Sequence, residues 1–341
     1  MPSDNLAELE RELIDILTTQ GLPVEEIRLV GLLGQGTRAT VFSVQINGVY
    51  HVLKVYDSKD SLRAELKNLK KVTPKDRLLF SWQERLEDDR KINLAIIEVP
   101  EGQSINSDRL DPDTTVSLVE QIATLHRIKY RQKVSLTTLE QQFNRTKKPF
   151  FEHIALMGLD QKVYSKLIDA LQAMLTKSPD LFRVHKVRVH GDLWWPNVIV
   201  SDGGVYLIDW ESVHRGDACE DVAKLRTVLH FPSNDQMTNF FWRSPEHANQ
   251  VAQLTGQLVD RHNQLGDTTM VERLKFYLPA ACIEHLAQRY LLGNTSLSVD
   301  KAINQIVAEE ALRLFENPLV SPPNLTNHNY FTEIQALRRN N

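Results

Sequence analysis

The chain has 341 residues, of which 42% are hydrophobic and 25% charged, the composition of a globular protein with an apolar core. Its formal net charge of −4 provides no attraction to nucleic acid or to an anionic membrane, and two cysteines are too few for a disulfide framework or a thiolate metal cluster. No apolar run reaches the roughly 20 residues that cross a bilayer, and the acidic N-terminal segment is unlike a signal peptide. We therefore expect a cytoplasmic protein that binds neither nucleic acid nor a membrane.

The first hundred residues predict a helix followed by a sheet that contains a second helix. Leu and Ile at helical spacing predict the first helix over residues 4–20, which Gly21 ends. A second helix is predicted over 61–72, with its leucines on one face. Asn47-Gly48 is a strong hairpin signal between two strands. The segments with strand character are EIRLVGLLGQG, TVFSVQING, VYHVLKVYD, RLLFSWQERL and INLAIIEVP.

Beyond residue 100 the sequence is mostly helical. The predicted helices cover 114–128, at least two segments within 134–177, the chain from 217 to about 315, and 330–338. A short β insertion at 187–210 interrupts this region, with its turn at Asp202-Gly203-Gly204. The whole predicts an α+β fold with a small β-rich lobe and a larger, mostly helical lobe.

A pair of glycines marks the turn between the first two predicted strands. In Gly34-Gln35-Gly36 the absence of side chains at the glycines would let backbone amides approach a phosphate chain closely. A plain β-turn has the same composition, so this pattern alone is weak evidence of nucleotide binding.

Lys54 lies in a strand with apolar neighbours. Val52, Lys54 and Tyr56 share one face, so the lysine either extends to an edge of the sheet or points into a cleft. A buried ammonium needs a carboxylate partner, and Glu65 on the following helix is the candidate. Taken alone, Glu65 reads more simply as a solvated helix residue.

Three polar residues border the predicted β insertion. Asp192, Asn197 and Asp209 form a D-x4-N-x11-D series, and the hairpin turn would bring Asn197 and Asp209 to the same end of two strands. Oxygen ligands without His or Cys suit Mg²⁺, which leaves Asp192 to orient or deprotonate an attacking hydroxyl. Each residue alone is a common turn former, but their spacing between strand-like segments argues against coincidence.

Together these motifs carry a family resemblance. The glycine turn, the strand lysine, the helix glutamate, HGDLWWPN and LIDWE, in this order, resemble the aminoglycoside phosphotransferase and choline kinase family, which shares the protein-kinase-like fold. HRGDACEDVAKL (214–225) and LHRI (125–128) are similar to two further motifs of that family. The similarity covers roughly residues 27–230. A tryptophan after HGDL, Trp194, also resembles the fructosamine kinase branch, which hints at sugar-like substrates. The simpler expectation is that Trp194 and Trp195 pack this loop against the larger lobe.

The resemblance implies a bilobal protein-kinase-like fold and a role for each matching residue. Asp192 would be the catalytic base, and Asn197 and Asp209 would hold Mg²⁺. Lys54, paired with Glu65, would position the α- and β-phosphates of ATP or GTP. The implied organisation is an N-terminal helix (1–23), a nucleotide-binding N-lobe (24–100) and a catalytic and acceptor-binding C-lobe (101–341).

The remaining nucleotide contacts would come from Gly34 and Gly36 and from the hinge AIIEVPEGQSI. In one register Pro100 stands where a backbone N–H donates to the nucleotide base, and proline has no N–H. In the other register Val99, preceded by Glu98, supplies the amide. Both registers remain open, and with them the choice between ATP and GTP.

Two other readings share these residues. A protein kinase would place an activation segment of about 20 or more residues after the metal-binding aspartate, whereas GDACED begins at residue 216, shortly after Asp209. A catalytically silent nucleotide-binding protein would be expected to have lost Lys54, Asp192, Asn197 or Asp209, and all four are present. We therefore expect a Mg-dependent phosphotransferase with a small-molecule acceptor such as an aminoglycoside, a choline-like molecule, a sugar or a glycated amine.

The helices after residue 217 are expected to line the acceptor pocket. Acidic side chains would suit an acceptor with an amine, and an aromatic ring could cap a cationic group. For any single acidic residue a solvated surface position is the safer expectation. The candidates are Glu220, Asp221, Glu246, Asp260, Glu272, Glu284, Trp242, Tyr277 and His285.

Overall fold

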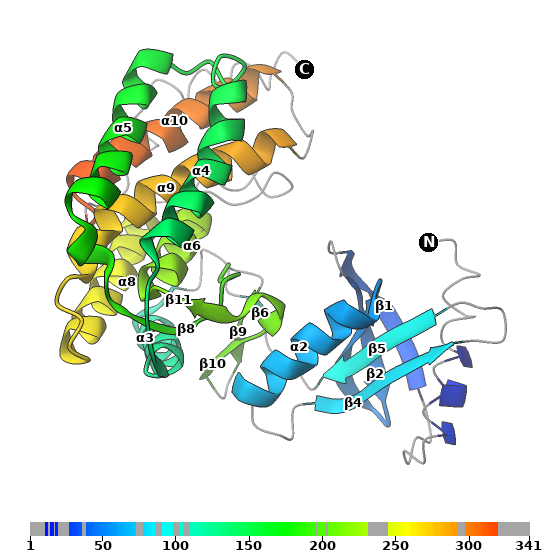
Figure 1. The fold of residues 1–341 in the computed structure, drawn as a ribbon. Coiled ribbons are helices and arrows are strands. Elements are labelled where there is room, and N and C mark those ends of the chain that lie inside the picture. Colours follow the sequence, from blue (N-terminus) through cyan, green and yellow to red (C-terminus); the bar gives the residue numbers. More distant parts are fainter. Residues whose placement is uncertain are drawn as a thin grey trace. The chain divides into compact units, whose positions relative to one another are not determined.

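The chain forms two compact units in a computed structural model (Figure 1). Unit 1 comprises Met1–Gly102 with Ile208–Ser212, and unit 2 comprises Gln103–Leu207 with Val213–Asn341. The structure describes residues 11–12, 14–16, 18–19, 27–35, 39–72, 78–85, 91–97, 103–104, 110–194, 197–201, 204–230, 245–291 and 297–319. None of the helices among these residues is long and apolar enough to cross a membrane.

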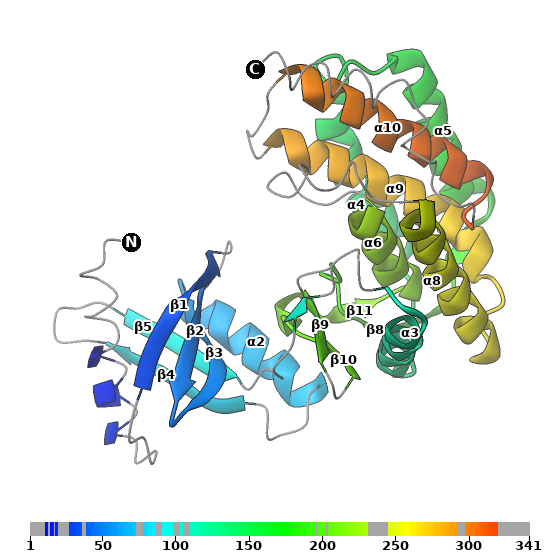
Figure 2. The ribbon, with the colours of Figure 1, turned by 180° about the vertical axis from the view of Figure 1, so that it is seen from behind.

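Unit 1 is an antiparallel sheet with one long helix against it (Figures 1 and 2). The strands lie in the order β1-β2-β3-β5-β4 and all five predicted strand segments are present. Their bounds are β1 (Ile27–Gln35), β2 (Ala39–Ile46), β3 (Val49–Tyr56), β4 (Leu78–Arg85) and β5 (Lys91–Ile97), and the helix is α2 (Lys59–Val72). Of the predicted N-terminal helix, the residues described between 11 and 19 are helical.

The β2–β3 hairpin forms where the sequence predicts it. Ile46 pairs with Val49 across a two-residue loop, in which Asn47 and Gly48 have φ values of 49° and 82°. Positive φ at both positions defines the hairpin turn that matches strand twist, and Asn-Gly is the sequence that tolerates it best. This turn sets the register of β3 and so decides which way Lys54 points.

Alternation along β3 separates an apolar face from a polar one. Leu53 is fully buried in a cluster with Phe42 and Ile96, which lie on the neighbouring strands β2 and β5. Because successive side chains point to opposite faces of a sheet, Lys54 and Tyr56 face away from this cluster.

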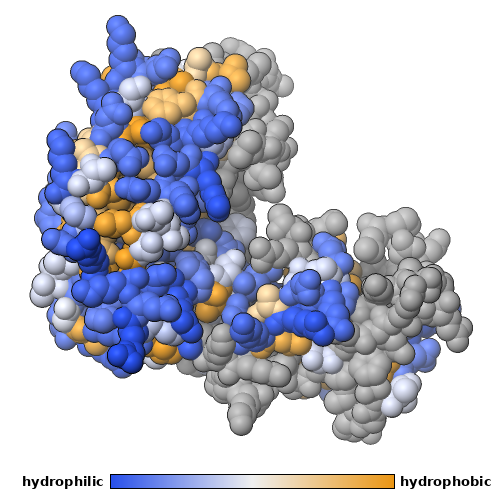
Figure 3. Space-filling model, viewed as in Figure 1, coloured by the Kyte–Doolittle hydropathy of each residue, from blue (hydrophilic) through white to orange (hydrophobic). Residues whose placement is uncertain are grey.

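Unit 2 is built mainly of helices, as the sequence predicts. They are α3 (Pro112–His126), α4 (Leu136–His153), α5 (Gln161–Lys177), α6 (Ala218–His230), α8 (Pro245–Gln264), α9 (Met270–Leu291) and α10 (Leu297–Glu316). Helix α9 packs against α4, α6 and α10 (Figure 1). Hydrophilic side chains cover most of the described surface of this unit in Figure 3, with apolar side chains between them. The helix predicted over 330–338 lies outside the described residues.

Two small sheets in unit 2 divide the predicted β insertion. One has the order β10-β9-β6 and the other β11-β8-β7, so β8 does not pair with β9. Their bounds are β6 (Gln103–Ser104), β7 (Lys129–Lys133), β8 (His185–Val189), β9 (Val198–Ser201), β10 (Gly204–Leu207) and β11 (His214–Gly216). The sequence does not predict β7, because KYRQK has no alternation of apolar and polar residues and its strand is mostly exposed.

A buried arginine joins α9 to the segment that leads into α6. Arg273 is fully buried, and its Nε donates to Asp217 Oδ2 at 2.7 Å while its Nη2 donates to Asp267 Oδ2 at 2.6 Å. Cys219 N donates in turn to Asp217 Oδ1 at 3.0 Å, so Asp217 also caps the start of α6. The guanidinium and two carboxylates therefore fix the start of α6 to α9.

We expect Asp217→Ala to destabilise unit 2 by about 3–5 kcal/mol, because it leaves the Arg273 charge buried without the fully buried one of its two carboxylate partners. Urea unfolding followed by circular dichroism measures this loss. Asp260→Ala, at an exposed position of α8, is the matched control and should stay within about 0.5 kcal/mol of the unchanged protein. Equal stability of the two variants would show that the Arg273 network does not hold α6.

Candidate functional site

Lys54 lies at the centre of the unit 1 sheet, with Val41 and Ala95 as its neighbours in register. Its Nζ donates to Glu65 Oε1 at 2.9 Å and to Asp209 Oδ1 at 2.8 Å. Lys54 is 8% exposed and Glu65 only 1%. The simpler expectation for Glu65 taken alone, a solvated helix residue, is therefore wrong, because its side chain faces β3 from the buried side of α2.

The electrostatics of this cluster keep Lys54 charged. Burial by itself lowers the pKa of the ammonium, but the carboxylates of Glu65 and Asp209 outweigh burial and raise that pKa above its usual value. Tyr56 donates its hydroxyl to the second oxygen of Glu65, and burial together with this carboxylate raises the pKa of the tyrosine. Lysine and tyrosine on one face of β3 thus hold both oxygens of a single glutamate.

Asp209 sits at an unusual point of the backbone, directly before the short 3-10 helix η5 (Trp210–Ser212). Its φ of 64° lies in the left-handed region, which Asp tolerates better than most residues with a side chain. Asn68 of α2 donates to the carbonyl oxygen of Trp210 at 3.0 Å and so ties this segment to the helix. The left-handed conformation of Asp209 and the hydrogen bond from Asn68 together direct the Asp209 carboxylate toward Lys54.

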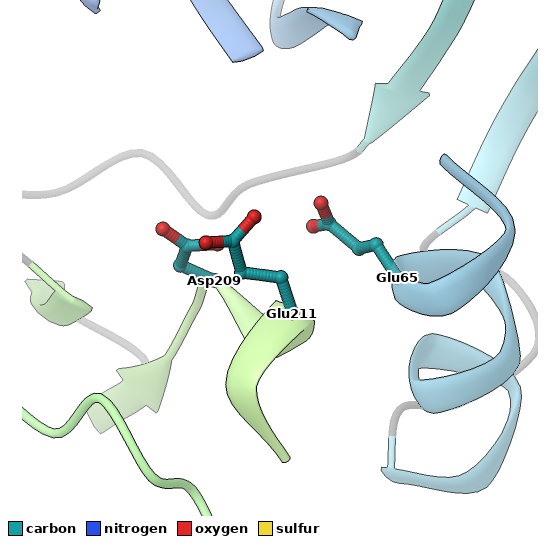
Figure 4. Close-up of side chains that lie close together, drawn as sticks. All are labelled: Glu65, Asp209 and Glu211. Atoms are coloured by element: carbon teal, nitrogen blue, oxygen red, sulfur yellow. The ribbon is translucent and has the colours of Figure 1, made fainter. Parts of the chain in front are cut away.

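Glu211 is a member of this cluster that the sequence reasoning missed. Figure 4 shows its carboxylate beside that of Asp209, with Glu65 facing both from α2. One oxygen from each of the three lies within 4.8 Å of the others. The signal was present in LIDWE, where Glu211 follows Asp209 by two positions. Carboxylate oxygens are the donors that Mg²⁺ prefers, so the described part of unit 1 fits a hard divalent cation.

Unit 2 contains the loop that carries Asp192. After β8 ends at Val189, the backbone N–H groups of His190 and Gly191 donate to the carboxylate of Asp221 at 2.7 and 2.9 Å. Gly191 has a φ of 78°, a conformation that side-chain-bearing residues rarely adopt. Asp221 is fully buried in the first turn of α6, so this helix determines where the loop leaves the sheet.

Asn197 braces Asp192 within the same loop. Its Nδ2 donates to the backbone oxygen of Asp192 at 2.9 Å and to Asp192 Oδ2 at 3.3 Å. With its nitrogen turned to Asp192, the amide presents its oxygen in the other direction, as a metal ligand would require. Asn197 is buried, and Trp194 in the intervening turn is partly buried.

Lys224 is the second site residue that the sequence reasoning missed. Its Nζ lies 2.5 Å from Asp192 Oδ1 and 3.5 Å from the carbonyl oxygen of Gly191. Lys224 follows Asp221 by one helical turn of α6, so both residues face the same loop. Nothing in the sequence distinguishes Lys224 beyond its place within DVAKL.

A chain of buried hydrogen bonds lies behind Asp221. His262 Nδ1 donates to the carbonyl oxygen of Leu258 at 2.7 Å, and burial lowers the pKa of His262 to about 4. This neutral ring therefore accepts at Nε2 from His126 Nδ1, 2.9 Å away. His126 Nε2 faces Asp221 Oδ2 at 3.0 Å.

His126 lies between two buried partners. Burial alone would raise the pKa of Asp221, but the hydrogen bond from His126 and the interactions with His190 together outweigh burial and lower it, so this carboxylate only accepts. A fully buried pair, Asp221 with His126, thus lies directly beneath the loop that carries Asp192.

A cavity of about 380 Å³ lies in unit 2, between α4, α6 and α9. Gly191 and Lys224 form part of its wall, which brings it against the loop of Asp192. Four of the residues predicted to line an acceptor pocket do line it, namely Glu220, Glu284, Tyr277 and His285. Phe143 and Phe276 add aromatic surface.

The other predicted site residues have different positions. Asp221 lies beneath the loop rather than in the cavity, because its carboxylate is saturated by backbone N–H groups and His126. Gly34 is paired with Val41 at the end of β1. Asp260 and Glu272 are exposed. The predictions that fall outside the described residues are Gly36, Glu98, Val99, Trp195, Trp242 and the side chain of Glu246.

Asn197 and Asp209 lie next to the same end of the β9–β10 hairpin along the chain. Val198 pairs with Leu207, so Asn197 directly precedes the first strand and Asp209 follows the second by two residues. Asn197 belongs to unit 2 and Asp209 to unit 1. Their joint role as metal ligands stays a prediction.

The low pKa of His262 makes stability depend on pH. Between about pH 6.5 and about pH 4 the folded protein binds fewer protons at this ring than the unfolded chain, so stability falls as the pH drops through that window. We expect His262→Gln, which keeps a neutral donor and acceptor, to reduce this loss by up to roughly 3 kcal/mol. Urea unfolding at neutral pH and at pH about 4.5 measures it. His185→Gln, at an exposed position, is the control; identical pH dependence in both variants would contradict the neutral ring.

Solved structures of known proteins have a fold similar to that of this chain. A choline kinase from Cryptosporidium parvum Iowa II has a TM-score of 0.58 and 14% identity, over 91% of this chain and 98% of that one. A thermostable aminoglycoside phosphotransferase APH(4)-Ia, in ternary complex with AMP-PNP and hygromycin B, has a TM-score of 0.55 and 19% identity, over 88% and 97%. ADP-bound aminoglycoside phosphotransferase APH(2'')-Ib has a TM-score of 0.51 and 14% identity, over 88% and 98%.

At these identities the likeness establishes the fold, which is the kinase-like one that the sequence predicts. No curated protein sequence is significantly similar to the chain. The family model described as the phosphotransferase enzyme family, APH, matches residues 32–262. Since this match spans more than half of the sequence and includes both units of the fold, the chain belongs to the APH phosphotransferase family.

Proposed function

We propose that the chain transfers the γ-phosphoryl group of ATP or GTP to a hydroxyl group of a small molecule that binds in the cavity of unit 2. One observation carries this proposal. The cavity wall includes Gly191 and Lys224. Gly191 directly precedes Asp192 in the chain, and the Nζ of Lys224 lies 2.5 Å from Asp192 Oδ1. An acceptor at this end of the cavity would have its hydroxyl beside a carboxylate base.

In the proposed reaction Asp192 accepts the proton of the acceptor hydroxyl. The hydroxyl oxygen forms a bond to the γ-phosphorus, and the bond from that phosphorus to the β–γ bridging oxygen breaks, which releases the nucleoside diphosphate. Asn197 donates to both the backbone oxygen and the carboxylate of Asp192, so it would fix the direction of the base. The loop needs no covalent intermediate for this chemistry.

The unit 1 cluster would serve the nucleotide. Lys54, held by Glu65, would bind phosphate oxygens with a charge that its two carboxylate partners preserve. Asp209 and Asn197, with Glu211 as an additional oxygen donor, would hold Mg²⁺, which when bound neutralises phosphate charge. Two solved neighbours contain AMP-PNP or ADP, which supports a nucleotide as the donor.

The cavity lining favours an acceptor that carries a basic nitrogen. Burial raises the pKa of the Glu284 carboxyl, against the opposing effect of Lys224, and a bound cation would stabilise this group as an anion. The Tyr277 hydroxyl is buried in the cavity wall without a hydrogen-bond partner among the described residues. A volume of about 380 Å³ lies near the lower end of the range for small-molecule sites, which suits a compact amino alcohol or a single amino sugar.

The connection after Asp209 argues for a small acceptor over a protein. It consists of η5, the three residues of β11 and then α6, which begins at Ala218. A protein kinase uses an activation segment in this place to hold its peptide substrate. The described chain has no such segment between Asp209 and α6.

Two substitutions separate the roles of the aspartates. Asp192→Ala should leave Mg-ATP binding nearly intact and lower transfer by about 10²–10⁴-fold, because only the base is lost. Asp209→Ala should weaken Mg-nucleotide binding itself, because an oxygen ligand and a partner of Lys54 are lost. Calorimetric titration with Mg-AMP-PNP and a coupled assay for nucleoside diphosphate measure the two effects. Asp169→Ala, at an exposed position of α5, is the control.

The acceptor is to be found with a panel of aminoglycosides, choline, ethanolamine, sugars, glycated amines and amino acids, with Mg-ATP and Mg-GTP as donors. Turnover with one acceptor supports the proposal and identifies the substrate. Full turnover by Asp192→Ala would disprove the assignment of the base. If neither Mg-ATP nor Mg-GTP changed the melting temperature of the protein, the proposed activity as a whole would be disproved.

Glu284→Gln tests the preference for a cation. We expect it to raise the KM of an amine-bearing acceptor roughly tenfold or more, because a charged partner in the cavity lining is lost, while the KM of Mg-ATP stays the same. Steady-state kinetics with each substrate varied in turn measures both constants. Glu272→Gln, at an exposed position of α9, is the matched control. An unchanged acceptor KM would remove Glu284 from the binding site.

A further inference from the structure

Lys224 is a cation beside the proposed base that no part of the reaction above uses. The loop from Asp192 to Asn197, DLWWPN, contains no basic residue of its own. Among the described residues, Lys224 is the one cation within ion-pair distance of Asp192. It comes from α6, and its Nζ also lies 3.5 Å from the carbonyl oxygen of Gly191.

Stability does not account for this ion pair. The side chains of Lys224 and Asp192 are 39% and 31% exposed, and partly exposed pairs contribute little to folding because water screens them. Buried interactions already hold the loop on α6, since Asp221 accepts from His190 and Gly191. The ammonium group is therefore placed at a wet cavity wall, where an anionic ligand could reach it.

Four features suit Lys224 to binding a transferring phosphoryl group. It borders the cavity in which the acceptor hydroxyl would lie, and it contacts the carboxylate that would take the acceptor proton. Its flexible stem carries a point charge with three N–H donors, more than Asp192 alone uses. Helix α6, held at its start by Asp217 and Arg273, supplies a fixed base for that stem.

We propose that Lys224 is a catalytic residue whose ammonium group pairs with Asp192 before transfer and binds the transferring phosphoryl oxygens as Asp192 takes the acceptor proton. The proposal rests on the proposed phosphotransferase function. In this proposal the Lys224 ammonium of α6 lies beside the negatively charged oxygens of the transferring phosphoryl group.

The charges balance at each stage. Before transfer the Lys224 ammonium is offset by the Asp192 carboxylate. The proton that leaves the acceptor hydroxyl neutralises Asp192, while the acceptor oxygen bonds to the γ-phosphorus and the nucleoside diphosphate departs. Lys224 neither gains nor loses a proton. Its positive charge, no longer matched by Asp192, is offset by the new phosphate monoester until the product leaves and Asp192 releases its proton to water.

The test uses Mg-ADP with aluminium fluoride, which mimics a phosphoryl group in transfer and requires no knowledge of the acceptor. Lys224→Met should weaken binding of the Mg-ADP–aluminium fluoride complex by about 10–100-fold, the loss expected when a charged hydrogen bond is removed, and leave the affinity for Mg-ADP alone unchanged. Lys224→Arg should restore part of the loss. Lys166→Met, at an exposed position of α5, is the control, and melting temperatures check that every variant is folded.

A double-mutant comparison separates this role from simple neutralisation of the base. If Lys224 only offsets the charge of Asp192, Lys224→Met has no effect once Asp192→Asn has removed that charge. If it binds the phosphoryl group, Lys224→Met still weakens the aluminium fluoride complex in the Asp192→Asn background. No loss in that background overturns the proposal while leaving the phosphotransferase function intact. Failure of the unaltered protein to bind Mg-ADP overturns both.

Discussion

The loop that carries Asp192 depends on one buried carboxylate. Asp221 accepts hydrogen bonds from two consecutive backbone N–H groups and from the ring of His126, and no water is needed to satisfy it. Its place in the first turn of α6 adds the favourable field of a helix N-terminus. A carboxylate in this position is stable only when all of these donors are present, so the loop, α3 and α6 adopt one arrangement together. Asp192 and Lys224 then meet because both are attached to that arrangement.

The elements of the fold were largely readable from sequence because each is long enough to show a period. The five strands of unit 1 and the helices after residue 217 have regular apolar patterns, and Asn47-Gly48 specifies its turn through backbone sterics alone. Strand β7 was missed for the opposite reason. Its polar residues have no periodic signal, and it forms because β8 offers a free edge beside it.

The residues of the candidate site also divide into those that the sequence distinguishes and those that only the packing reveals. Lys54 stood out because a lysine in an apolar strand is an anomaly, and Asp192, Asn197 and Asp209 stood out through a spacing that few folds produce. Glu65 could not be told from a surface glutamate, because its burial is decided by the packing of α2 on β3. Lys224 and Glu284 are ordinary helix residues in the sequence. Only packing among helices far apart in the chain brings them to one cavity.

The two hydrogen bonds to Glu65 have a consequence for how unit 1 can be controlled. Helix α2 is attached to β3 through both oxygens of one glutamate, and Asn68 attaches it again to the segment after Asp209. Swinging the helix outward would take from Lys54 one of its two carboxylate partners and from the buried Tyr56 hydroxyl its acceptor at the same moment. These contacts fix α2 on β3 without any bound ligand, so the position of Glu65 beside Lys54 is a property of the folded unit 1 itself.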